Sequence, residues 1–180
     1  SITNIRIGQA ALAVTKNWHD EKNAGGKRPA SVQFQVYQDG QPFMPGADSG
    51  IGSITCTGAS WDPTTGIITV SNAGDTNTAS TWSFRLENLP LFSDTGVPHT
   101  YNLEEIGDGQ LTVGGESKTG TFSYYLSTQG ETTIRTNPGT PDLVTYAFTF
   151  DNTLTGTTRH TVHKTWQDRE SGGCDRPDLY

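Results

Sequence analysis

Short runs of alternating residues most strongly restrict how this chain of 180 residues can fold. Residues 31–41, SVQFQVYQDGQ, place Val32, Phe34 and Val36 on one face and polar residues between them, and residues 82–90, WSFRLENLP, alternate in the same way. A period of two predicts half-buried strands. No stretch carries a sustained apolar stripe with the 3.6-residue period of a helix. Several short strands with frequent turns predict an all-β fold, an antiparallel β-sandwich.

Further strands are expected wherever this alternation recurs, and surface loops are expected where it is absent. Two segments lack it and are rich in turn residues, which predicts loops at residues 45–53 and 127–142. The other expected strands lie in GIITVSNAG (66–74), HTYNLEEIGDG (99–109), TGTFSYYLST (119–128) and LVTYAFTFDNTLTG (143–156).

The charge balance excludes several classes of partner. The formal net charge is −7, and no basic stripe interrupts the acidic background. Such a balance disfavours binding to nucleic acid and to anionic membrane surfaces. No apolar run approaches the roughly 20 residues that cross a bilayer, so no membrane insertion is expected. The Asp-containing turns lack the ligand spacing of a calcium loop, so no metal and no cofactor are expected.

The two cysteines leave their own state open. Cys56 and Cys174 could form a disulfide in an oxidising compartment, or both could remain free thiols. A single pair is no disulfide framework, so the rest of the chain has to fold without it.

One phrase of the sequence occurs twice. Residues 14–29, VTKNWHDEKNAGGKRP, and residues 162–177, VHKTWQDRESGGCDRP, share Val-x-Lys-x-Trp-x-Asp and a final Arg-Pro. Lys16 and Lys164 are 148 positions apart (164 − 16), as are Asn4 and Asn152 (152 − 4). The spacing predicts a tandem repeat cut slightly out of phase. We expect residues 1–11 to be the tail of a preceding unit or a linker, residues 12–158 one β-sandwich, and residues 159–180 a linker and the first strand of a following unit.

These motifs resemble the B-type repeat of the collagen adhesin family, the Cna B-type domain of Gram-positive surface adhesins and pilins. The resemblance rests on VTKNWHDEKNAGGKRPASVQFQVYQDG, on WSFRLENLPLFSDTGVPHTYNLEE and on YAFTFDNT. Lys-x-Trp-x-Asp, Arg-Pro, Asn-Leu-Pro and Tyr-x-Leu-x-Glu appear in the order typical of the family. The pieces cover under half of the chain, and residues 44–80 and 106–142 are longer than the family pattern. The resemblance implies an inverse immunoglobulin-like sandwich with long loop insertions.

The resemblance also implies a self-formed isopeptide bond between a lysine of the first strand and an asparagine of the last. Mapped onto this sequence, the crosslink joins Lys16 to Asn152, and Glu105 relays the proton. Burial disfavours both the ammonium and the carboxylate forms, so a buried Lys–Glu couple can rest as a neutral pair. The neutral acid can then donate a hydrogen bond to the Asn side-chain oxygen and pass a proton to the departing ammonia.

The alternation places these three residues inward. Glu105 is expected on the same strand face as Leu103, and Asn152 on the same face as Phe150. Lys16 is expected on the same face as its apolar neighbours Val14 and Trp18. Charged or amide side chains at such positions are costly unless they are paired.

Two functions fit this reading, and the resemblance favours the first. The first is a structural stalk module of a cell-wall-anchored adhesin or pilus protein at a Gram-positive cell surface, with neighbouring repeats of the same chain as partners. The alternative is a ligand-binding module that grips a host protein or glycan through residues 44–80 and 106–142. An enzyme acting on other molecules is not expected, because no nucleophile elbow and no convincing carboxylate pair is present.

Overall fold

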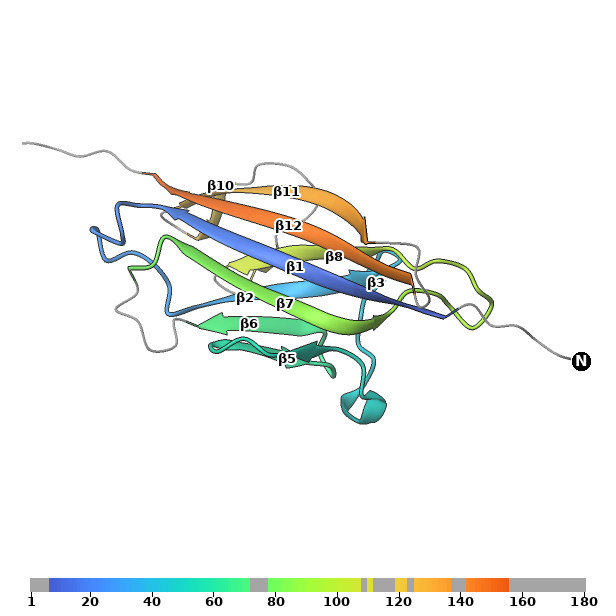
Figure 1. Cartoon of the computed structure of the whole chain (residues 1–180). Helices are drawn as coiled ribbons and strands as arrows, with labels where there is room; N and C mark the ends of the chain where they lie inside the picture. The colour runs from blue at the N-terminus through green and yellow to red at the C-terminus, as the bar shows by residue number, and fades with distance from the viewer. Residues whose placement is uncertain are drawn as a thin grey trace, which may run out of the picture.

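The computed structural model describes residues 7–71, 78–107, 110–111, 119–122, 125–136 and 142–155. They form two facing β-sheets (Figure 1), which confirms the all-β sandwich. The first sheet has the order β10-β11-β12-β1-β7-β4 and the second the order β5-β6-β2-β8-β9, with β3 paired to β2. The strands of the first sheet are β1 (Gly8–His19), β4 (Ser53–Ile54), β7 (Thr81–Pro90), β10 (Thr119–Phe122), β11 (Tyr125–Thr136) and β12 (Asp142–Leu154). Those of the second are β2 (Ser31–Gln38), β3 (Gln41–Pro42), β5 (Ala59–Asp62), β6 (Ile67–Ser71), β8 (Tyr101–Gly107) and β9 (Gln110–Leu111).

The first and last described strands lie side by side in the middle of the first sheet (Figure 1). They are parallel, and their register runs from Gly8↔Asp142 to His19↔Thr153. Because the strands are parallel, the start of β1 and the end of β12 lie at opposite ends of the sandwich. A force that separates the two ends therefore shears this whole ladder of hydrogen bonds.

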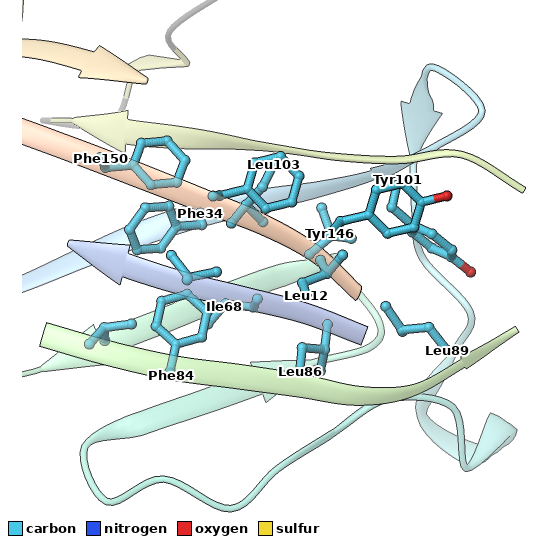
Figure 2. Close-up of a cluster of buried hydrophobic side chains, with 14 of the residues drawn as sticks. Leu12, Phe34, Ile68, Phe84, Leu86, Leu89, Tyr101, Leu103, Tyr146 and Phe150 are labelled. Atoms are coloured by element: carbon cyan, nitrogen blue, oxygen red, sulfur yellow. The ribbon is translucent and has the colours of Figure 1, made fainter. Parts of the chain in front are cut away.

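The core fills the space between the sheets with the inward residues of each alternating strand (Figure 2). The ring of Phe34 on β2 lies 4.9 Å from that of Phe150 on β12 and 5.4 Å from that of Phe84 on β7. Aromatic contacts at such distances add to the free energy of burial. The predicted alternation of residues 31–41 and 82–90 is confirmed, and Asp39 and Gly40 adopt the positive φ angles of a tight hairpin turn after β2.

The N-terminal domain boundary expected at residue 12 stays a prediction. β1 begins at Gly8, whose carbonyl accepts a hydrogen bond from the backbone N–H of Leu91. Residues 8–11 belong to this strand. Residues 159–180, the predicted linker and following first strand, lie outside the described residues, as does Asn4.

The prediction of a loop at residues 127–142 is wrong. Most of it is β11, which pairs with β12 from Tyr125↔Leu154 to Thr136↔Leu143. Residues 128–133 are exposed whichever way their side chains point. They need no apolar alternation, because the backbone ladder to β12 holds them in place. These residues therefore form a strand although their sequence lacks the alternation that predicts one.

Residues 44–80, expected as a long insertion, contain three short strands between their turns. Within this segment, the indole Nε1 of Trp61 on β5 donates to the carbonyl of Ile51, 3.1 Å away. A Cβ atom at Gly52 would lie 2.5 Å from the same Nε1, so the chain passes tightly against this ring. Trp61 thus holds the chain around residues 51–52 against β5, an outer strand of the second sheet. No helix in the described ranges is long and apolar enough to cross a membrane.

Candidate functional site

The two sheets bring a lysine and a glutamate into contact in the core. Lys16 of β1 and Glu105 of β8 face each other across the sandwich, with Nζ 2.8 Å from Oε1. Their side chains are 1% and 3% exposed. Glu105 pairs in register with Phe34, and Lys16 pairs with Phe150, so this contact lies directly beside the contact between those two rings.

Asn152 lies next to this pair on β12 and is fully buried. The register pairs Asn152 with Trp18 and Phe150 with Lys16, which makes Asn152 a diagonal neighbour of Lys16 on the same face. Diagonal neighbours in a sheet are about 7–8 Å apart, a span that a long side chain crosses. The structure therefore gathers the three residues singled out from the sequence in one part of the core.

The side-chain polar atoms of these three residues make no hydrogen bond to any residue that the structure describes. This applies to Nζ of Lys16, to both carboxylate oxygens of Glu105, and to both amide atoms of Asn152. The 2.8 Å contact has the distance of an ion pair but not the angles of a hydrogen bond. Buried polar groups without partners cost about 1–3 kcal/mol each, so their clustering calls for an explanation beyond stability.

The electrostatics of the site lower the pKa of the lysine amine. Burial lowers the pKa of Lys16 below its ordinary value, and the opposing effects of Glu105 and Asp151 reduce this shift without reversing it. The Nζ atom also lies 4.7 Å from the centroid of the Trp18 ring. A lysine whose pKa is lowered holds more of the unprotonated form, which is the nucleophile in amide formation.

A second buried charge pair closes the end of the sandwich next to this site. The Arg28 guanidinium donates from Nε and Nη2 to the two carboxylate oxygens of Asp20, each at 2.6 Å. The hydroxyl of Tyr125 donates to Asp20 at 2.9 Å, and the Arg28 guanidinium lies 5.2 Å from the Trp18 ring. Burial opposes ionisation of Asp20, but the hydrogen bonds from Arg28, from the Asn23 backbone and from Tyr125 together lower its pKa.

This cluster is formed by residues of the motif that occurs twice in the sequence. Trp18, Asp20 and Arg28 are the Trp, Asp and Arg of the duplicated motif, and all three are buried at one place. No role was predicted for these residues, although the same three residue types recur at Trp166, Asp168 and Arg176, which is the signal in the sequence that could have revealed them. Residues 166–176 lie outside the described residues.

The remaining sequence expectations concern the cysteines and metals. Cys56 is exposed, and its thiol lies 3.4 Å from the carbonyl of Ser83. Cys174 lies outside the described residues, so the disulfide between the two stays a prediction. In the described ranges, no three His, Cys, Asp or Glu side chains gather in a way that could hold a metal ion.

Comparison with known proteins finds one family model that is similar to part of the chain. The family model of the Cna protein B-type domain matches residues 12–62, which include Lys16 but neither Glu105 nor Asn152. The collagen adhesin of Staphylococcus aureus is 47% identical over 34 residues, which are 19% of this chain and 3% of that protein.

Two solved structures of the collagen binding protein of the same organism are also similar. One holds two B repeat units, with 22% identity and a TM-score of 0.36 over 82% of this chain and 26% of that one. The other holds a single B repeat unit, with 23% identity and a TM-score of 0.32 over 79% of this chain and 51% of that one. The sequence match to the curated relative covers only a small part of that protein's length.

Proposed function

We propose that this chain, whose residues 12–62 match the model of the Cna protein B-type domain, is a force-bearing stalk module of a bacterial cell-surface adhesin, closed by a Lys16–Asn152 isopeptide bond. Neighbouring repeats of the same chain are its covalent partners, and a host extracellular protein is the partner of the adhesin as a whole. The module acts on no other molecule. Its chemistry is a single reaction on itself.

One observation carries this proposal. Lys16 and Glu105 meet at 2.8 Å in the interior, and Asn152 is their unpaired neighbour on the same face. A purely structural core would hold apolar side chains here, because replacing a buried ion pair by well-packed apolar residues is often neutral or stabilising. The site keeps an amine, an acid and an amide together, and none of their side-chain polar atoms makes a hydrogen bond to a described residue. Such an arrangement suits a reaction among the three.

The reaction balances with these groups alone. The neutral Nζ of Lys16 attacks Cγ of Asn152, while Glu105 as the protonated acid donates a hydrogen bond to Oδ1. A bond forms between Nζ and Cγ, and the bond between Cγ and Nδ2 breaks. Glu105 takes a proton from the amine and delivers one to Nδ2, which leaves as ammonia. The rigid strands supply the proximity that an enzyme would otherwise provide.

The strand topology would make this bond carry the force applied to the two ends of the domain. Lys16 lies near the end of β1 and Asn152 near the end of β12, and the two strands are parallel neighbours. Tension enters at the start of β1 and leaves at the end of β12, so the crosslink carries the load between them. Residues 17–151 are then shielded from the force. This is the property that a stalk between a cell wall and a bound surface requires.

Single-molecule stretching from the two chain ends tests the proposal. Unfolding of a Lys16→Ala variant should release the segment between residues 16 and 152, an extension on the order of 400 Å at about 3.3–3.6 Å per residue. The wild-type protein should show no such step at the same forces. A wild-type protein that extends as far as the variant would contradict the stalk proposal.

A further inference from the structure

A buried serine lies directly opposite the asparagine of the site. The antiparallel register of β11 and β12 pairs Ser127 with Asn152. Directly opposite residues of an antiparallel pair project to the same face, with Cβ atoms about 4.5–5.5 Å apart. Asn152 is thus flanked by Trp18 of β1 on one side and by Ser127 of β11 on the other.

The hydroxyl of Ser127 has no partner in the described structure. The residue is 9% exposed, and its Oγ atom makes no hydrogen bond to any described residue. Tyr125, two positions earlier on the same strand, is also buried but already donates its hydroxyl proton to Asp20. A small, strongly buried hydroxyl without a partner, facing an amide that also has none, is costly unless the two are used together.

We propose that Ser127 is a positioning residue for the formation of the Lys16–Asn152 bond. Its Oγ accepts a hydrogen bond from Nδ2 of Asn152 and so holds Oδ1 toward Glu105. This inference rests on the proposed function, since it assigns a role in the same reaction. Ser127 gives up no proton and forms no covalent bond.

The side-chain amide of Asn152 needs a hydrogen-bond donor for its oxygen and an acceptor for its nitrogen. Glu105 supplies one donor, which suits Oδ1, whereas Nδ2 carries two N–H groups that need an acceptor. Among the two register neighbours of Asn152, the Trp18 indole offers a donor but no acceptor. Ser127 is therefore the neighbour whose lone pairs can hold Nδ2 until it departs as ammonia.

Timed cell-free synthesis followed by intact-mass measurement tests this role. Protein made in a short pulse is quenched in acid at intervals, and the fraction that is lighter by about 17 Da, the mass of ammonia, is followed over time. Ser127→Ala should slow this mass loss on the order of tenfold, the effect of one lost hydrogen bond in the interior. Ser127→Thr keeps the hydroxyl on a residue that suits a strand, so it should react at close to the wild-type rate. Ser83→Ala, at an exposed position of β7, is the matched control and should react at the wild-type rate.

A pH series separates positioning from a general loosening of the core. A serine hydroxyl does not titrate in this range, so Ser127→Ala should slow the reaction equally at every pH. A change in the burial of Lys16 would instead shift the pH profile. Thermal unfolding of Ser127→Ala in the Lys16→Ala background, where no crosslink forms, should show that the variant still folds.

The outcomes distinguish this inference from the proposed function. If the wild-type protein reacts and Ser127→Ala reacts at the same rate, the role of Ser127 is wrong and the stalk proposal stands. If Ser127→Thr is as slow as Ser127→Ala, the hydroxyl is not what matters, and the inference again fails. If the wild-type protein never loses the mass of ammonia, both are wrong.

Discussion

The amine of Lys16 and the carboxylate of Glu105 lie 2.8 Å apart, although they come from different sheets and are 89 positions apart in the chain (105 − 16). The contact joins the two layers of the sandwich within the buried core. Removing one member of a buried pair costs about 3–5 kcal/mol, because the other charge is left without compensation. The same contact places the proton-relay group next to the nucleophile of the proposed reaction.

Glu105→Gln should abolish crosslinking. An amide cannot take a proton from the lysine amine and pass it to the departing nitrogen, so this variant should keep the full sequence mass. The matched control is Glu104→Gln, because Glu104 is adjacent in β8 but lies on the opposite face of the strand. Intact-mass spectrometry of both proteins makes the comparison. Loss of ammonia in Glu105→Gln at the wild-type extent would show that Glu105 is not the relay.

The lowered pKa of Lys16 predicts a pH dependence in protein that cannot crosslink. In an Asn152→Ala variant the amine remains, and its folded-state pKa lies below the unfolded value of about 10.4. The unfolded chain then binds more protons between the two pKa values, so the free energy of unfolding should rise with pH across that window. Urea unfolding at a series of pH values measures this slope.

The control for that slope is the double variant Lys16→Met/Asn152→Ala, which has no amine at the site. Its free energy of unfolding should rise less with pH than that of Asn152→Ala. The measurements should stop near pH 9.5, below the pKa of about 10 of tyrosine in the unfolded chain. Burial and Glu104 raise the folded-state pKa of Tyr37 to about 12. At higher pH, tyrosine therefore ionises first in the unfolded chain, which lowers the free energy of unfolding and masks the rise expected from Lys16. Equal slopes in the two variants would contradict the lowered pKa.

Arg28→Met should destabilise the sandwich by about 3–5 kcal/mol, because it leaves the Asp20 carboxylate buried without its partner. Arg85→Met tests a pair of the same type in a different environment. The Arg85 and Glu87 side chains are 39% and 46% exposed, and exposed pairs contribute at most about 1 kcal/mol. Urea unfolding in the Lys16→Ala background measures both variants without the crosslink. Similar losses for the two would show that the buried pair is not special.

Asp20→Asn should change the response to acid. The folded-state pKa of Asp20 is lowered, so the ionised carboxylate stabilises the fold above its unfolded pKa of about 3.9, and this stabilisation is lost as the pH falls further. The variant should therefore be much less stable than the parent at neutral pH, and the difference should shrink below about pH 4. A constant difference from neutral to acid pH would mean that Asp20 carries no such shift.

The sequence predicted those parts of the fold where one strand face is apolar and the other polar. Val32, Phe34 and Val36 alternate strictly, and the strand, its turn and its inward face are as expected. The start of β11 falls within the strand expected at residues 119–128, but its continuation to Thr136 escaped prediction. Residues 128–133 are exposed on both sides and are held by backbone pairing, which leaves no pattern in the side chains.

The site could be predicted only in part for a related reason. Alternation fixed the inward faces of Lys16, Glu105 and Asn152, but Ser127 became visible only once β11 and its register were known. Asp20 and Arg28 were recognised from the sequence only as members of the repeated motif and were assigned no role. Asp20 and Arg28 are buried on either side of a turn in which Glu21, Lys22 and Asn23 have positive φ angles. No simple residue pattern predicts such a turn.

The most direct test of the covalent stalk is the intact mass of the purified wild-type protein. The account predicts a mass about 17 Da below that of the sequence, since one molecule of ammonia is lost per bond, and recovery of the full mass in Lys16→Ala and in Asn152→Ala. Tandem mass spectrometry of a digest should then find a branched peptide in which residues 16 and 152 are joined. A wild-type protein with the full sequence mass, folded and fully matured, would contradict the account.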